Sequence, residues 1–193
     1  WSSRVMAPSS LVFYLGIKGR MKDVLHHNLF FDADFKIHSE EIYTSKKWPT
    51  DPLFYMSAPS VTDDTIAPDG HENLFILIPI APDLEDTEAI RERYFSRVLE
   101  RIKMITGEDL QDRIVYKRSY CVKDFKADYH SFQGNAYGLA NTLRQTAFMK
   151  PKMKSRKLDN LYFTGQLTVP GPGIPPALIS GQIVAREVMK NYA

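Results

Sequence analysis

The segment from Asn160 to Ile179, NLYFTGQLTVPGPGIPPALI, constrains the fold more than any other part of the chain. A short apolar run, Leu161 to Phe163, ends near Gly165, and a turn rich in glycine and proline follows. Pro175 and Pro176 then open an apolar segment with no further proline before the C-terminus. This order predicts a strand, a tight loop and the N-terminus of a helix.

Such a junction is suited to holding a ligand. It presents bare backbone N–H groups and the positive end of a helix dipole to whatever lies above it. Gly171 and Gly173 have no Cβ, so a planar ligand can approach the main chain there. The N–H groups of Gly173 and Ile174 are the candidate donors, because Pro175 has none.

The segment resembles the C-terminal flavin-contacting motif of the phytoene desaturase family, the FAD-dependent carotenoid desaturases. That motif is a strand, a glycine, T-x-P-G-x-G-x-P and a helix. The matching residues here are Gly165, Thr168, Pro170, Gly171, Gly173 and Pro175. Further segments resemble the family in the same order, namely residues 11–17 followed by His26 and His27, residues 59–63 with 67–70, and residues 134–138. The resemblance covers nearly the whole chain.

The resemblance implies roles for individual residues. FAD would be contacted by Gly165, Gln166, Thr168, Pro170, Gly171, Gly173, Ile174 and Pro175. Gln166 stands where related flavin oxidases often place an acidic residue toward the ribityl chain, and its amide can donate or accept there. Tyr137 and Gly138 would lie where the substrate channel meets the flavin. For Tyr137 the alternative is a packed aromatic side chain whose hydroxyl is satisfied.

The family also carries a G-x-G-x-x-G fingerprint that holds the FAD pyrophosphate. The chain begins at Trp1 and contains no such motif after a strand. We therefore expect it to be the C-terminal portion of a longer enzyme. We also expect the isolated chain to lack FAD and to be inactive.

Composition excludes several classes of function. The net charge of +2 argues against a nucleic-acid partner. The single cysteine, Cys121, permits no internal disulfide, which fits a cytoplasmic location, and we expect it to be a packing residue. No apolar run is long enough to span a bilayer, so membrane contact would be peripheral or would come from a segment outside this chain. The basic run from Lys150 to Lys157 predicts a solvated loop, with anionic lipid headgroups as an alternative partner.

No metal site is predicted. No cysteine or histidine spacing resembles a zinc site. His26 and His27 are adjacent, so in a strand they would face opposite sides.

Apolar patterning predicts further elements. Strands are expected at residues 11–18, 28–31, 53–57, 74–78 and 113–121, and helices at residues 87–106 and 175–190. The run from Leu74 to Ile78 is continuously apolar, so both of its faces should be covered, one by a helix and the other by a second layer or an apolar ligand cavity.

The clearest of these helices is residues 87–106. It would begin at an Asp86 N-cap and end at Gly107. Its buried face is expected to carry Ile90, Tyr94, Val98, Ile102 and Ile105. Its solvated face would carry Arg91, Arg93, Arg97 and Arg101.

These elements indicate an α+β/α/β architecture. Residues 1–133 would form part of a substrate-binding domain, a mixed β-sheet with packed helices, and residues 134–193 the C-terminal strand–loop–helix of a Rossmann-like FAD-binding domain. We expect residues 11–18 and 74–78 to share one sheet, with the 87–106 helix on one of its faces.

The function implied by the resemblance is desaturation of a carotenoid such as phytoene, a long apolar polyene, by hydride transfer to the flavin. No catalytic base is nominated, because the flavin performs the difficult step. The alternatives are another flavin oxidoreductase, similar to retinol saturase or to amine or porphyrinogen oxidases, and a catalytically inactive module that binds an apolar ligand or a partner. The sequence does not predict the oligomeric state.

Overall fold

The computed structural model describes residues 2–192, which form two compact units. One unit spans Pro8–Gly134, and the other comprises residues 2–7 together with residues 135–192. The N-terminal residues join the second unit through backbone pairing, since the Ala7 N–H donates to the Gly138 carbonyl at 2.8 Å and the Ala140 N–H to Val5 at 3.0 Å. The sequence patterns did not predict this grouping of residues 2–7.

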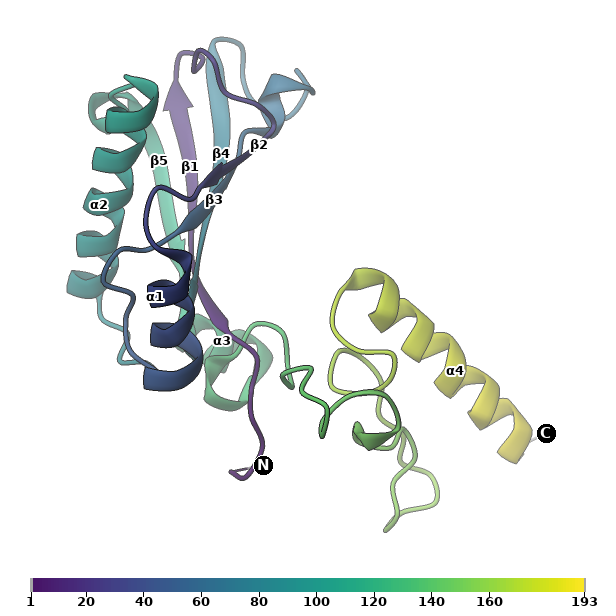
Figure 1. Ribbon diagram of the computed structural model, residues 1–193. Helices are drawn as coiled ribbons and strands as arrows, with labels where there is room; N and C mark the ends of the chain where they lie inside the picture. Colours follow the sequence, from purple (N-terminus) through teal and green to yellow (C-terminus); the bar gives the residue numbers. More distant parts are fainter. Residues whose placement is uncertain (1, 193) are drawn as a thin grey trace. The chain divides into compact units, whose positions relative to one another are not determined.

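The Pro8–Gly134 unit is built on a five-stranded sheet with the order β2-β3-β4-β1-β5 (Figure 1). Its strands are β1 (Ser9–Lys18), β2 (His27–Phe30), β3 (Phe54–Ser57), β4 (His71–Ile80) and β5 (Ile114–Tyr120). All neighbouring strands are antiparallel, so the prediction of a mixed sheet was wrong. The reason is topological: β4 and β5 run in the same direction on either side of a crossover helix, but β1 lies between them and pairs with both.

The predicted pairing of the first and fourth apolar strands is confirmed. β1 and β4 are neighbours along their whole length, with Leu11 opposite Ile78 and Leu15 opposite Leu74. The residues of one face are fully buried and form the core. On the other face Phe75 and Leu77 are half-buried, so no second layer of the described unit fully covers β4 there.

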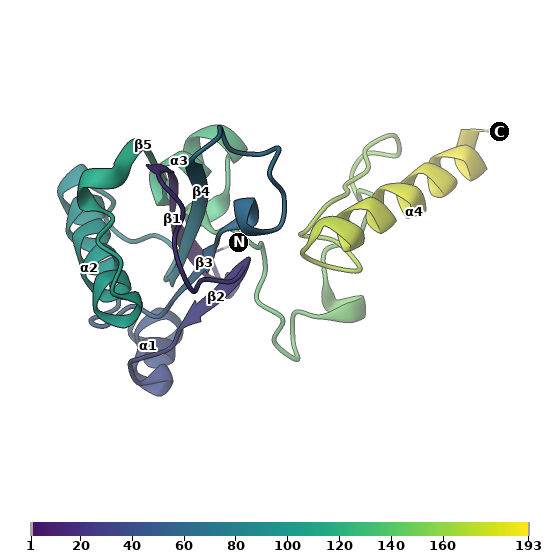
Figure 2. The same ribbon diagram turned by 90° about the horizontal axis from the view of Figure 1, so that it is seen from above.

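Helix α2 (Glu88–Thr106) packs on the buried face of the sheet, as predicted (Figures 1 and 2). It begins one residue later than expected, because the Thr87 hydroxyl, and not Asp86, accepts the cap hydrogen bond from the Ile90 N–H at 3.3 Å. It ends at Gly107, as predicted, in a left-handed conformation with φ 75°. Ile105 is 50% exposed, so its assignment to the buried stripe was wrong.

Arg91 was placed on the solvated face of α2, and this too was wrong. Its guanidinium donates to both carboxylate oxygens of Asp86 at 2.7 Å, and to Asp124 at 2.7 Å. Both Arg91 and Asp86 are buried. The cluster therefore ties α2 to α3 (Val122–Tyr129) inside the unit.

Shorter elements complete this unit. They are α1 (Phe35–Glu40), a π-helical turn (Glu41–Ser45) and 3₁₀ turns at Pro59–Val61, Gln111–Arg113 and Phe132–Gly134.

The second unit contains one long helix, α4 (Ile174–Tyr192), and a 3₁₀ turn, Ala147–Met149. The strand expected at residues 161–163 does not form; a single bridge between Lys154 and Tyr162 stands in its place. Within residues 2–192, no helix combines the length and apolar character needed to cross a bilayer.

Candidate functional site

The loop that leads into α4 is shaped by its own polar groups. The Gly165 carbonyl accepts hydrogen bonds from the Thr168 N–H at 3.1 Å and from its hydroxyl at 2.9 Å. Thr168 is buried, so it closes a turn inside the loop. Its hydroxyl is therefore engaged in holding the backbone.

Ser180 fixes this turn to α4, and the sequence analysis missed it. Its hydroxyl oxygen accepts from the Gly165 N–H at 2.7 Å, lies 2.7 Å from the Thr164 hydroxyl, and donates to the Ala177 carbonyl at 2.6 Å. The side chain is fully buried. The available signal was a lone hydroxyl residue followed by Gly181 in an otherwise apolar helical stretch.

The first turn of α4 closes on the loop. The Ala177 N–H donates to the Gly173 carbonyl at 3.0 Å, and the helix begins at Ile174. Gly171 has φ 140° and Gly173 has φ 109°, a region in which side chains are strained. The predicted flavin contacts thus lie along one continuous loop and helix start, with Gln166 half-buried and Pro170, Ile174 and Pro175 exposed.

Lys150 lies beside this loop, which corrects its assignment to a solvated basic run. Its side chain is 4% exposed, and Nζ has no hydrogen-bond partner within residues 2–192. A Cβ added to Gly171 would lie 3.4 Å from Lys150 Cε and 3.6 Å from Nζ. Burial lowers the pKa of Lys150. The exposed members of the run, Lys152, Arg156 and Lys157, match the prediction.

The predicted substrate segment meets the predicted cofactor loop. A Cβ added to Gly138 would lie 3.0 Å from Leu167 Cδ2 and 3.4 Å from Gln166 Cγ. Gly138 has φ 83°, and its N–H donates to the buried Asn135 side chain. The neighbouring Tyr137 is 44% exposed, so its ring is available at the surface of this unit.

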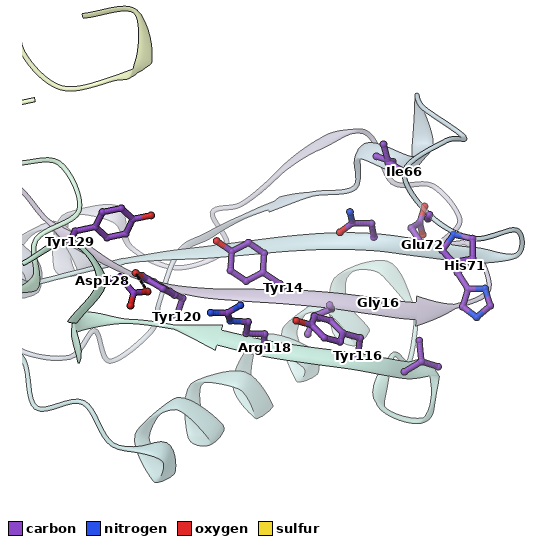
Figure 3. A pocket seen from close by; sticks show the side chains of 15 residues that line it. Tyr14, Gly16, Ile66, His71, Glu72, Tyr116, Arg118, Tyr120, Asp128 and Tyr129 are labelled. Carbon is purple, nitrogen blue, oxygen red and sulfur yellow. Dashed lines mark hydrogen bonds between the residues drawn. The ribbon is translucent and has the colours of Figure 1, made fainter. Parts of the chain in front are cut away.

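A second feature lies in the Pro8–Gly134 unit, on the sheet face that α2 does not cover. Aromatic rings form a row across four strands, from His27 through Tyr55 and Phe75 to Tyr14. Successive ring centroids are 5.9, 6.3 and 5.5 Å apart. A cavity of about 700 Å³ begins at Tyr14 and extends over β5. Figure 3 shows the side chains that line it. Its wall includes Tyr14, Tyr116, Arg118, Tyr120, Tyr129 and Ile66.

One end of this cavity carries a polar pair. The Tyr120 hydroxyl donates to Asp128 at 2.9 Å (Figure 3). Burial and the nearby Asp128 carboxylate raise the pKa of Tyr120 well above its ordinary value. The Tyr120 hydroxyl therefore keeps its proton to a higher pH than that of an exposed tyrosine.

The histidines and the cysteine have no catalytic arrangement. The rings of His26 and His27 lie 4.2 Å apart, so the expectation of opposite orientations was wrong; His26 precedes β2 and escapes the alternation of the strand. Within the described residues, no cluster of three metal-ligating side chains occurs. Cys121 is fully buried in the hydrophobic core, which confirms it as a packing residue, and this burial raises its pKa to about 12.

Comparison with known proteins gave several relatives. No protein-family model matches the chain. It is 45% identical over all 193 residues to a carotenoid 3,4-desaturase of Haloarcula japonica and covers 39% of that protein. It is 32% identical over 187 residues, 94% of the chain, to a zeta-carotene-forming phytoene desaturase of Myxococcus xanthus, and covers 35% of it.

A third relative has another printed activity. Over 186 residues, 94% of the chain, the identity to a 4,4'-diaponeurosporene oxygenase of Staphylococcus haemolyticus is 34%, covering 37% of that protein. The chain therefore spans less than two fifths of the length of these curated relatives.

Proposed function

Because the chain belongs to the phytoene desaturase family, we propose that it is part of an FAD-dependent oxidoreductase that desaturates a carotenoid. In this proposal the Pro8–Gly134 unit belongs to the substrate-binding domain, and the unit of residues 2–7 and 135–192 contains the final segment of a Rossmann-like FAD-binding domain. The pyrophosphate half of the cofactor would be held by another part of the enzyme.

The observation that carries the proposal is the surroundings of the loop before α4. Two glycines with positive φ leave the main chain bare, a helix begins at Ile174, and a buried ammonium without a partner in residues 2–192 lies against Gly171. These features fit a planar group with an electron-rich edge, such as a flavin. Gly173 and Ile174 would donate N–H groups to it, and Gly165 and Gln166 would lie toward its ribityl chain. When bound, FAD would accept the hydride that leaves the substrate.

The open face of the sheet supports a polyene substrate. The row from His27 to Tyr14 presents aromatic rings, and the cavity at Tyr14 extends it over β5. A conjugated chain is flat, long and apolar, so it buries well against such rings. We place the substrate on this face. For Tyr137 and Gly138, in the other unit, we propose substrate contact separately, on the ground of the family resemblance.

Peripheral contact with a membrane belongs to the same proposal, since a carotenoid dissolves in lipid. Leu29, Phe31, Phe35 and Ile37 are each more than half exposed, and the rings of Phe31 and Phe35 lie 6.3 Å apart. Neighbouring exposed apolar side chains of this kind mark interaction surfaces.

The decisive experiment uses the full-length protein. After purification with FAD, its visible spectrum should show bound flavin, and incubation with phytoene or another acyclic carotenoid in liposomes should yield products that have lost two hydrogens per step. Tyr14→Ala should lower conversion with flavin content unchanged, while Ile105→Ala, on the exposed side of α2, should not. A protein without flavin, or products that gain oxygen as the oxygenase relative suggests, would refute the proposed desaturation.

A further inference from the structure

Lys150, beside the cofactor loop, buries its ammonium group at a cost in free energy. The side chain is 4% exposed, and its ammonium has no hydrogen-bond partner among residues 2–192. A buried cation without a counter-charge loses its hydration free energy and gains no interaction that offsets this loss. Most buried polar groups in proteins have hydrogen-bond partners, so the unpaired Nζ indicates that its partner is a group other than residues 2–192. Here that partner must be an acceptor of hydrogen bonds and preferably an anion.

The surroundings of Nζ narrow down that partner. Gly171 is itself buried, and a Cβ on it would lie 3.6 Å from Nζ. Three residues further along, the 19-residue helix α4 begins at Ile174, with the positive end of its dipole. The ammonium and the helix start thus supply positive charge to one short stretch of backbone. Because the glycines remove side chains from this stretch, a flat group can lie against it.

We propose that Lys150 Nζ is the counter-charge for the N1–C2=O edge of the flavin ring. This rests on the proposed function and assigns to it a residue outside the glycine and proline motif. Bound FAD would accept a hydride, a hydrogen with both electrons of its C–H bond, from the polyene, and the neighbouring hydrogen would pass to water as a proton. The reduced cofactor would be an anion, and Lys150 would stabilise its charge at the N1–C2=O edge. A cation fixed in a dry site stabilises that charge more strongly than one in water.

The other anion of the cofactor, its pyrophosphate, is a weaker match. A tetrahedral phosphate does not need a flat approach over bare backbone, whereas a ring does. The two sources predict different measurements. A partner of the ring edge changes the flavin's reactivity, and a partner of the phosphate changes only how tightly FAD is held.

The test compares four full-length proteins: wild type, Lys150→Met, Lys150→Arg and Lys152→Met. Lys152 is the matched control, because it is exposed in the same segment. The probe is sulfite, which adds to flavin N5 through its sulfur lone pair and leaves the same negative charge on the ring. We expect Lys150→Met to bind sulfite about tenfold more weakly, or worse, and to have a lower reduction potential. Lys150→Arg and Lys152→Met should stay close to wild type.

A second measurement does not need the cofactor. In the 193-residue chain, Lys150→Met should raise the urea midpoint, since it removes an uncompensated buried charge, while Lys152→Met should leave it unchanged. A Lys150→Met chain that is less stable than wild type would mean that the lysine is structural, and would overturn the inference.

The remaining outcomes separate the inference from the proposed function. A wild-type enzyme without flavin overturns both. If wild type carries flavin, and Lys150→Met retains the sulfite affinity and reduction potential of wild type, only the role of Lys150 is overturned. The same conclusion holds if Lys150→Met differs from wild type only in binding FAD less tightly. If Lys150→Met loses flavin altogether, Lys150→Arg decides: retained flavin and sulfite affinity support the inference, and their loss overturns it.

Discussion

Replacing Arg91 with methionine should destabilise the sheet-bearing unit severely. Arg91 makes two hydrogen bonds of 2.7 Å to Asp86 and one of 2.7 Å to Asp124, and donates to the Ser119 hydroxyl at 3.1 Å. The Asp86 side chain is 1% exposed. Without the guanidinium, the Lys123 N–H at 2.9 Å is the remaining described donor to this buried carboxylate. Breaking a buried ion pair from one side costs about 3–5 kcal/mol.

That loss is large against the stability of a typical domain, which is about 5–15 kcal/mol. It can be measured by urea unfolding of the 193-residue chain, with Trp48 as the fluorescent reporter in a Trp1→Phe background. The Trp48 ring lies 4.8 Å from that of Tyr94 on α2, so its emission follows the packing of this helix. The control is Arg93→Met, an exposed position on the same helix, which should cost no more than about 1 kcal/mol.

The pH dependence gives an independent reading of the same cluster. Burial by itself would raise the pKa of Asp86, but the hydrogen bonds from Arg91 and from the Lys123 N–H outweigh it, so the pKa lies below its ordinary value. A lowered folded-state pKa contributes stability that is present above the unfolded-state value, about 3.9, and is lost as the pH falls through the folded-state value. This acid-linked loss should be smaller in an Asp86→Asn variant.

Two results would refute the reasoning. The first is an Arg91→Met chain whose unfolding free energy lies within about 1 kcal/mol of wild type. The second is an Asp86→Asn/Arg91→Met double variant no more stable than Arg91→Met alone. Removing both charges should recover part of the loss, because no unpaired ion is then left buried.

Three further outcomes are expected. Gly173→Val should deplete flavin from the full-length enzyme, because φ is 109° at this position and the ligand needs the bare backbone. The same substitution at Gly107, a helix terminus with open space around it, should cost only stability, on the order of 1 kcal/mol. The flavin content per folded protein distinguishes the two variants. Ser180→Ala should speed hydrogen exchange at the Gly165 amide and leave the Gly138 amide unchanged, at a cost of about 1–3 kcal/mol, because the Gly165 N–H loses its acceptor. Cys121 should resist iodoacetamide near neutral pH in the native chain and react in urea, since burial holds its pKa at about 12; fast native labelling would contradict that burial.

Local patterns were enough to predict most elements of this protein. Strand β1 was predictable because its run is rich in aliphatic and aromatic residues. Helix α2 was predictable because the helical spacing of its apolar residues reflects which face is buried. The loop before α4 was also predictable, because glycine and proline determine the conformation of their own backbone. The predicted N-cap of α2 was wrong by one residue because Asp86 and Thr87 are both good N-cap residues. In the folded chain the Asp86 carboxylate accepts hydrogen bonds from Arg91, and Thr87 caps the helix.

Tertiary structure decided the features that depend on distant partners. The placement of β1 between β4 and β5 follows from long-range pairing, which no local pattern encodes. The short apolar run at residues 161–163 has strand composition but only one bridge partner, so it forms no strand. The sequence likewise marked Arg91 and Lys150 as members of charged surface segments. Folding buries Arg91 against Asp124, 33 positions away, and Lys150 against Gly171, because the free energy of a charge is set by the groups that surround it in space.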